Sequence, residues 1–466
     1  MSDEGVPTVR RHAAVIVTCT IALFVGLLVL HGVSGMMADN KRAEVLRAWA
    51  GTLGSLEEVL ELYPARESNE TAARVEEFSA ALGIDMAPER VEGHTRPTDQ
   101  AEKAYRGTRL AVGNFLDEQF ESGGPSPEPP PAAVVGFLRE HAATLAGLKE
   151  VLDDGDSPRW QLQLEKPYSM PLPNLRGHVD LQRLLMADAL IRDAAADFSG
   201  ALAALEASWQ LNAALRDEPV LVSQGIALGV ARTQLGTLRH IEQLPPRWRE
   251  RILEHDYRQS TLTSLRYEGW IWMTLFDQAS YAIADAPWSG LILRVARPYV
   301  GYCAADVSDS WRRLLIRFSE LTSICDSAPE DVGVGPELDV PSWNLVGGQL
   351  LPGLGDVAQR LARYELDREM TVKLLEIRAA RAALGSSWPV SLPGIEESTV
   401  CPGDHWIYAV TPQGGMSLTL SRPVDWGELS GATLSTRYVV PAPAAGDAPR
   451  ARAPIAGKVR ATPPGN

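Results

Sequence analysis

Cysteine is scarce in this chain, which contains four in 466 residues. Cys19 lies within an apolar run, and Cys303, Cys325 and Cys401 cannot all pair with one another. No CxxC pair and no cysteine–histidine spacing indicates a zinc site. A helix of about 25 Å predicted between Cys303 and Cys325 separates these two residues too far for a bridge. In an oxidising compartment we therefore predict a disulfide between Cys325 and Cys401.

Motifs for catalysis and cofactor binding are also missing. The histidines include no HExxH motif and no pair at helical spacing, which argues against a hydrolytic metal site. No Gly-x-Ser-x-Gly elbow is present, and the glycines between residues 325 and 355 match no phosphate-binding loop. Cys401 and His405 are close enough in sequence to act as nucleophile and base, but a disulfide or buried thiol at this turn is the favoured interpretation. The charged run 254–256 is interpreted as solvated surface. The sequence thus predicts no metal and no cofactor, and it leans away from an enzyme.

Basic residues are in deficit. The chain has 44 Lys and Arg against 59 Asp and Glu, with a formal net charge of −15 and a pI near 5.1. Such a charge repels nucleic acid and anionic lipid headgroups, so we expect no nucleic-acid binding. With 45% hydrophobic and 22% charged residues, the composition is still that of a folded globular chain, long enough for two packed regions.

Charge is absent from residues 12–38, which contain no Asp, Glu, Lys or Arg. A helix here, at roughly 1.5 Å per residue, is long enough to cross a hydrocarbon core about 30 Å thick. A cleavable signal peptide is the alternative, because Arg10 and Arg11 precede the run and small residues follow at 33–35. The apolar core exceeds the length of about 7–15 residues that is typical of a signal peptide. We therefore predict an uncleaved membrane helix over residues 13–35, in contact with the lipid bilayer.

The charges that flank this single-pass helix do not determine its orientation in the membrane. Basic residues lie on both sides, at positions 10 and 11 and at positions 41, 42 and 47, so the positive-inside rule does not decide. A short head (residues 1–12) stays in the cytoplasm easily, whereas a long acidic chain is translocated largely regardless of its charge. We predict that the ectodomain lies on the non-cytoplasmic side of the membrane.

Beyond the anchor the apolar period is helical. Apolar residues recur every three or four positions in the segment 46–63, which predicts one helix that ends before Pro64. This seam either faces the core of the same chain, which we favour, or mediates self-association as a short coiled coil. Further helices are predicted from an Asn69 cap to Gly83 and after Thr98.

The overall prediction is a mainly α fold with an N-terminal transmembrane helix, a helical ectodomain and a small C-terminal α+β unit. Prolines between residues 123 and 131 predict a linker that separates two helical blocks. A helix over residues 132–152 places His141 in an apolar stripe, where a hydrogen-bonded core histidine is expected. The predicted regions are a head (1–12), the transmembrane helix (13–35), a helical region (36–122), the linker (123–131), a helical domain (132–324), an irregular loop (325–355), a helix plus β-hairpin (356–440) and a disordered tail (441–466).

Three helices are predicted between His178 and Leu244, and two of them carry a resemblance. The run Ala196–Leu202, with small residues at Ala201 and Ser208 and at Ala189 in the preceding helix, resembles a tetratricopeptide repeat. Acidic and basic residues at positions 188 and 192 depart from that pattern, and no second copy follows. The resemblance implies close packing of a helix pair and suggests protein binding.

Aromatic residues are concentrated between residues 257 and 288. Trp270, Trp272 and Tyr281 lie there among arginines and carboxylates. Such rings either fill a helical core, which we favour, or form a surface that stacks sugar rings of an envelope glycan.

The C-terminal block has a pattern of its own. A helix over residues 356–384 ends at Gly385, and Gly414-Gly415 separates two short β-prone runs, 406–410 and 416–420. This pattern predicts an antiparallel hairpin with a two-residue turn, with Trp406, Tyr408 and Val410 on the face that packs on the helix. A third strand is predicted within residues 432–440.

This block resembles the C-terminal part of a diffuse group of uncharacterised bacterial single-pass membrane proteins and, loosely, pseudopilin globular domains. The matching residues are Gly385, Trp388, Pro389, Leu392, Pro402, Gly403, Tyr408 and Gly415. The pseudopilin processing site is absent, and the resemblance implies no activity. We therefore predict a membrane-anchored envelope protein that acts as a non-catalytic scaffold or protein-binding accessory subunit. The alternative is an envelope enzyme or glycan-binding protein that uses the aromatic segment.

Overall fold

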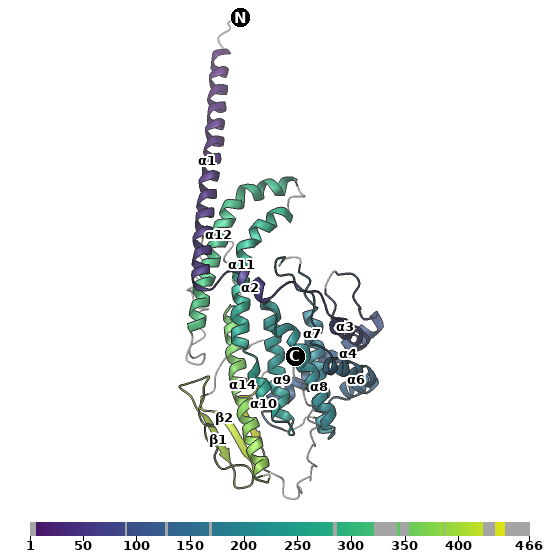
Figure 1. Ribbon diagram of the computed structural model, residues 1–466. Helices are drawn as coiled ribbons and strands as arrows, with labels where there is room; N and C mark the ends of the chain where they lie inside the picture. The colour runs from purple at the N-terminus through teal and green to yellow at the C-terminus, as the bar shows by residue number, and fades with distance from the viewer. Residues whose placement is uncertain are drawn as a thin grey trace, which may run out of the picture.

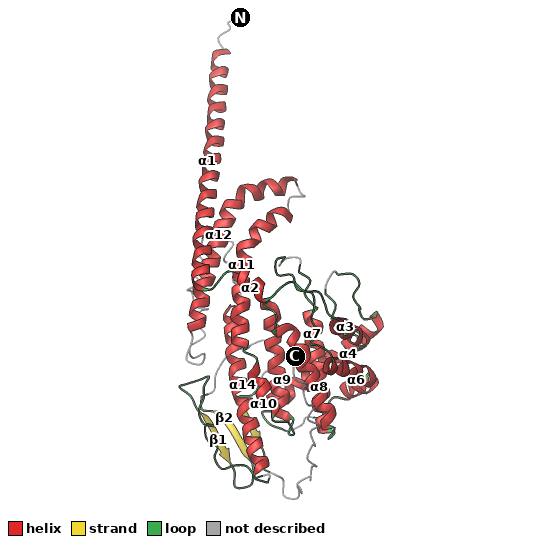
Figure 2. Cartoon of the chain, in the orientation of Figure 1, coloured by secondary structure: helices red, strands yellow, loops and turns green. Residues whose placement is uncertain are grey.

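The computed structural model describes residues 6–88, 91–125, 129–166, 170–282, 287–320, 343–344, 354–385, 387–422 and 434–442. Helices dominate, as predicted, and a small sheet lies at the end of the molecule away from the projecting N-terminal helix (Figures 1 and 2). The helices are α1 (Val6–Thr52), α2 (Leu56–Leu62), α3 (Glu70–Ala81), α4 (Asp99–Glu121), α5 (Ala132–Glu140), α6 (Ala142–Asp154), α7 (Leu175–Ala194), α8 (Phe198–Arg216), α9 (Leu221–His240), α10 (Arg247–Glu254), α11 (Tyr257–Ala282), α12 (Pro287–Glu320) and α14 (Leu354–Ala383). The strands are β1 (Trp406–Val410), β2 (Met416–Leu420) and β3 (Arg437–Val440).

Helix α1 contains the whole predicted membrane segment. It is long and apolar enough to cross a membrane, and the apolar stretch of its described residues is not buried within the chain. The helix stops at Thr52, so the prediction of one continuous helix through the seam 46–63 is wrong. Gly54 adopts a positive φ of 85°, which ends α1, and the Ser55 hydroxyl accepts from the backbone of Glu58 to begin α2. The apolar period continues across this break because both helices pack on the same core.

Side chains of the seam are buried within the chain, which supports the core-facing interpretation. Trp49 is fully buried, and its indole packs at 5.3 Å from that of Trp270 on α11. Trp49 also donates from Nε1 to the backbone oxygen of Ser308 on α12, at 3.3 Å. Val59 of α2 is buried in an adjoining cluster with Tyr267. The C-terminal part of α1 is therefore packed into the helical body.

Several helix starts follow the predicted caps. Asn69 accepts from the backbone of Ala72 at the start of α3, and Thr98 accepts from Ala101 at the start of α4. The helix predicted over residues 132–152 is instead two helices that break at His141. This histidine is half-buried and lies against the Phe137 ring, so it is not the core histidine that was predicted. His178 of α7 is the fully buried histidine of this region, but neither of its ring nitrogens is hydrogen-bonded, and burial lowers its pKa to about 3.

The largest core lies among α3 to α10 and includes one face of α14. It contains Phe115 and Phe120 of α4, before the proline-rich segment, together with Val134 and Leu138 of α5, after it. The segment therefore connects helices of one core and does not separate two packing units. Its described part also contacts the sheet, because the amide of Val439 donates to the carbonyl of Gly123 at 2.6 Å.

The C-terminal strands form an antiparallel sheet in the order β1-β2-β3. Trp406 pairs with Leu420 and Val410 with Met416, as the predicted hairpin requires. Five residues, 411–415, separate the two strands. Within this turn the amide of Thr411 donates to the carbonyl of Gly415, and the amide of Gly414 donates to the carbonyl of Thr411, both at 2.9 Å. The prediction of a two-residue turn is wrong. Trp406 lies on the buried face with Leu418, packed against Leu374 and Ile377 of α14, as predicted.

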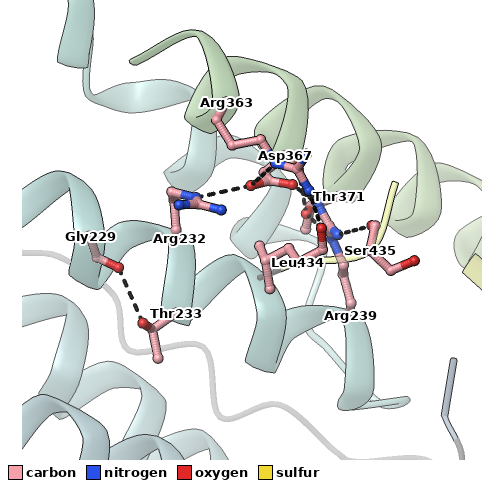
Figure 3. Close-up of polar contacts among 9 residues, drawn as sticks. All are labelled: Gly229, Arg232, Thr233, Arg239, Arg363, Asp367, Thr371, Leu434 and Ser435. Carbon is pink, nitrogen blue, oxygen red and sulfur yellow. Dashed lines mark hydrogen bonds and ion pairs between the residues drawn. The ribbon is translucent and has the colours of Figure 1, made fainter. Parts of the chain in front are cut away.

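A neighbouring face of α14 packs on α9 through a buried ionic cluster (Figure 3). Asp367 of α14 accepts from Arg232 and Arg239 of α9 at 3.1 and 3.2 Å, and from Arg363 at 3.3 Å. Arg239 also donates to the hydroxyl of Thr371 at 2.9 Å. Helix α14 is thus shared between the helical body and the sheet, which makes the C-terminal block continuous with the body.

Candidate functional site

Of the three aromatic residues interpreted as core, with a binding surface as the alternative, the structure describes the side chain of Trp270. Trp270 is 6% exposed and packs between α1 and α12. This burial supports the core interpretation for Trp270. The side chains of Trp272 and Tyr281 lie outside the described residues, as do the predicted loop between 325 and 342 and the tail from residue 443.

Cys401 cannot act as a nucleophile in the structure. It is buried and disulfide-bonded, while the nearby His405 is exposed. A disulfide sulfur has no thiolate to attack a substrate. Cys19 and Cys303 are free cysteines, and Cys325 lies outside the described residues, so its pairing with Cys401 stays a prediction.

The charged run 254–256 brings a serine and a histidine together. Glu254 and Asp256 are exposed, as interpreted, whereas His255 is only partly exposed, and its Nε2 lies 2.9 Å from the hydroxyl of Ser260. Its Nδ1 lies 3.8 Å from Asp217, beyond a hydrogen bond. The amide of Ser260 donates to Asp256 within the first turn of α11, so it is not available to an oxyanion. These contacts fix the start of a helix and lack the geometry of a catalytic triad.

The buried arginine cluster of Figure 3 is closed to ligands. Its guanidinium groups donate to Asp367, to Thr371 and to the backbone oxygens of Leu434 and Ser435. The cavity beside Arg239 has a volume of about 10 Å³, which is the size of a single water site. Burial lowers the pKa of Arg232 and Arg239, although Asp367 opposes that shift. The cluster holds α9 and α14 together and leaves no space for a substrate.

A larger cleft lies on the helical body, with a volume of about 470 Å³. Three segments form it: the loop after α3, the first three turns of α4 with the residues before them, and the start of α7. Two glycines bring these backbones together. A Cβ on Gly83, which has a φ of +80°, would lie 2.1 Å from the carbonyl oxygen of Ala101, and one on Gly177 would lie 1.8 Å from that of Asp85. The residues that line the cleft are Gly83, Ile84, Asp85, Arg96, Pro97, Glu102, Tyr105, Arg106, Arg109, Asn174, Arg176, Gly177 and Asp180.

Ion pairs hold the cleft arginines in place. Arg96 donates to Asp85 at 2.7 Å and to the Pro88 carbonyl at 2.6 Å. Arg109 donates through Nε to Asp180 at 2.8 Å, which leaves both terminal nitrogens of its guanidinium for other partners. Burial raises the pKa of Asp180, and the hydrogen bond from Arg109 opposes this shift. The walls of the cleft are therefore pre-organised by contacts within the protein.

Two further arginines lie at the open side of the cleft. Arg106 is exposed and pairs with Glu102 one turn earlier on α4. Arg176 is exposed in the first turn of α7, where the helix dipole also favours an anion. Four arginines and three carboxylates thus meet in one cleft of a chain whose net charge is −15. Guanidinium groups with unused donors bind carboxylates in a fixed, often bidentate, geometry.

Within the part of the chain that the structure describes, no group of three or more His, Cys, Asp or Glu side chains could hold a metal ion. Comparisons with protein-family models, curated proteins and solved structures found no match. The candidate site is therefore identified from the geometry of this structure alone. Sequence reasoning missed this cleft because its arginines and their partners lie on segments up to about a hundred residues apart and form no local motif.

Proposed function

We propose that this chain is a single-pass membrane protein whose ectodomain acts by binding and not by catalysis. Its anchor is α1. The apolar residues of this helix between 17 and 37 are largely exposed, whereas Val45 and Trp49 further along the same helix are buried in the ectodomain. An exposed apolar surface of this length favours lipid contact. Since the helix is uninterrupted between the two parts, it connects the anchor rigidly to the ectodomain.

The cysteines support a non-cytoplasmic ectodomain. Cys401 is disulfide-bonded, and structural disulfides persist mainly in oxidising compartments. This agrees with the orientation predicted from the short head and the long acidic chain.

The arginine-lined cleft is the observation that carries the binding function. Its size matches that of ligand sites, and ion pairs hold Arg96 and Arg109 in place before any ligand arrives. The three carboxylates of the cleft would repel a phosphate dianion, whereas a peptide with acidic and basic side chains can match both signs. We infer that the ligand is a segment of a partner protein that carries both acidic and basic side chains.

Site-specific crosslinking in native membranes tests this function. A photo-crosslinking amino acid replaces Leu110, which is 73% exposed and follows Arg109 on α4. Charge reversal by Arg176→Glu together with Arg106→Glu should lower the yield of each crosslinked adduct several-fold. Arg139→Glu, at an exposed arginine outside the cleft, is the matched control and should leave the yield unchanged.

Crosslinked adducts are identified by mass spectrometry, and the helical circular dichroism spectrum of each variant verifies folding. Equal adduct yields from the cleft variant and the Arg139→Glu control would contradict binding at this cleft.

A further inference from the structure

Helices α1 and α12 lie side by side and run in the same direction. A Cβ atom placed on Gly301 would lie 3.9 Å from the Cβ of Ala38, and further along both helices Trp49 donates to the carbonyl of Ser308. Ala38 is the first buried residue of α1 among those whose burial is described. Gly301 therefore marks the level at which α1 leaves the ectodomain, close to the end of the apolar segment 13–35.

Helix α12 bends near this level. Pro298 lies inside the helix, one turn before Gly301, and an internal proline removes a hydrogen bond and kinks the helix. Figure 1 shows that the first part of α12 turns away from α1, and that the end of α11 turns with it. The segment Pro287–Arg297, which we call the arm, thus leaves the side of α1 where its exposed apolar part begins.

The sequence of the arm has the pattern of an interfacial helix. Trp288, Leu291, Ile292 and Val295 recur at the spacing of one helical face. Arg294 lies within this run and Arg297 follows it, both away from that face by helical spacing, and residues 287–305 contain no Asp or Glu. Apolar and aromatic residues on one stripe, with arginines on the other, are typical of helices that lie in the headgroup layer of a membrane.

Exposed aromatic side chains lie just beyond the kink. Tyr299 is 41% exposed and Trp343 is 45% exposed. The two residues are joined, because the Tyr299 hydroxyl donates to the carbonyl of Trp343, and the ring of Tyr302 lies 5.6 Å from the Trp343 ring. Exposed Tyr and Trp are enriched where a protein crosses the boundary between lipid and water. They lie one turn from Gly301, at the level where α1 leaves the ectodomain.

We propose that the arm, together with Tyr299 and Trp343, lies in the interfacial layer of the bilayer that α1 crosses. This inference rests on the membrane anchor of the proposed function. A lipid surface is the occupant because the arm, the aromatic pair and the end of the apolar segment share one level of the molecule. A second contact of this kind prevents the ectodomain from rotating about α1, so that the binding cleft keeps a fixed direction relative to the membrane.

Fluorescence quenching on the full chain in lipid nanodiscs tests this proposal. In a Cys19→Ala, Cys303→Ala background, which keeps the Cys401 disulfide, single cysteines are introduced by Ile292→Cys or Tyr299→Cys and labelled with bimane without reductant. Val25→Cys reports on the anchor itself, and Val390→Cys, at a residue 90% exposed in the C-terminal block, is the aqueous control. Each label is exposed to iodide in solution and to a lipid nitroxide, which is attached near the headgroup for the labels at 292, 299 and 390 and deep in the acyl chain for the label at 25.

We expect labels at 292 and 299 to be quenched several-fold more by the lipid nitroxide than the label at 390, and less by iodide. Iodide quenching at 292 and 299 equal to that at 390 would overturn the proposal. Protection from both quenchers would overturn it as well, because protein and not lipid would then cover the arm. A label at 25 that lipid nitroxide fails to quench would refute the anchor and with it the proposed function, whereas quenching at 25 without quenching at 292 and 299 would refute the arm alone.

Discussion

Asp367 accepts from three arginine side chains in the interior of the protein. Arg232, Arg239 and Arg363 are each at most 8% exposed, so none of them can exchange the carboxylate for water. A buried ion group of this kind contributes little net stability compared with an apolar core, but losing one partner leaves uncompensated buried charge. The contribution of Asp367 to stability is therefore best measured by replacing this residue.

Asp367→Asn should lower the free energy of unfolding by about 3–5 kcal/mol, because the three guanidinium groups would stay buried without a counter-charge. Chemical denaturation of the full chain in detergent measures the change. Glu376→Gln is the matched control on the same helix, since the ion pair with Arg249 is exposed and should contribute at most about 1 kcal/mol. Equal losses in the two variants would show that the buried cluster does not join α9 and α14.

Glu218 gives the stability a dependence on pH. It is buried beside Arg66, at 2.9 Å, yet burial outweighs this partner and raises its pKa to about 7. Because the folded-state pKa lies above the unfolded value of 4.5, the folded state binds the proton more tightly. Its contribution to stability is complete below the unfolded pKa and is lost as the pH rises through 7.

Glu218→Gln removes this titration. Between about pH 5 and pH 8 the variant should lose less of its unfolding free energy than the wild-type protein does. Denaturation curves at several pH values measure the difference, with Glu242→Gln, at a residue half-exposed in its pair with Arg381, as the control that should follow the wild type. A variant whose pH profile matches that of the wild type would contradict the raised pKa.

At the scale of elements, the sequence predicted features that depend on neighbours along the chain. The caps at Asn69 and Thr98 were predictable because each side chain bonds to a backbone amide three residues later. The strand pairing of β1 and β2 followed from alternation, which the buried Trp406 and Leu418 confirm. The length of the turn between them could not be predicted in this way. The carbonyl of Thr411 accepts from the amide of Gly414 and its hydroxyl accepts from the amide of Gly415, which makes Thr411 part of the turn.

Helix breaks were harder to predict than helix starts. The apolar period runs across Gly54, so periodicity alone favoured one helix where the structure has two. The break at His141 has the same cause, since apolar residues on both sides face one core. The binding cleft was beyond sequence reasoning for a different reason: Asp85, Arg109 and Asp180 meet only after three segments have packed. Long-range packing, and not local preference, decides these features.

At the scale of the whole molecule, α1 joins an apolar stretch long enough to cross a membrane to the helical body. The helix continues without interruption from its exposed apolar part into the buried part at Val45 and Trp49. Any ligand bound at the cleft is therefore held at a defined place relative to the anchor. In the proposed membrane-anchored arrangement, the redox state of Cys401 reports the compartment in which the helical body lies.

The disulfide of Cys401 should be present in the protein as it is made by the cell. In the Cys19→Ala, Cys303→Ala background, a maleimide reagent added to unfolded protein should label nothing until a reductant is present. Cys325→Ser in this background should expose one reactive thiol, Cys401, if the predicted pairing is correct. It should also lower the free energy of unfolding by about 4 kcal/mol, because the unfolded chain loses a constraint that closes a loop of many residues. A free Cys401 in freshly isolated protein, alkylated during lysis to prevent later oxidation, would place the ectodomain in a reducing compartment and contradict the proposed orientation.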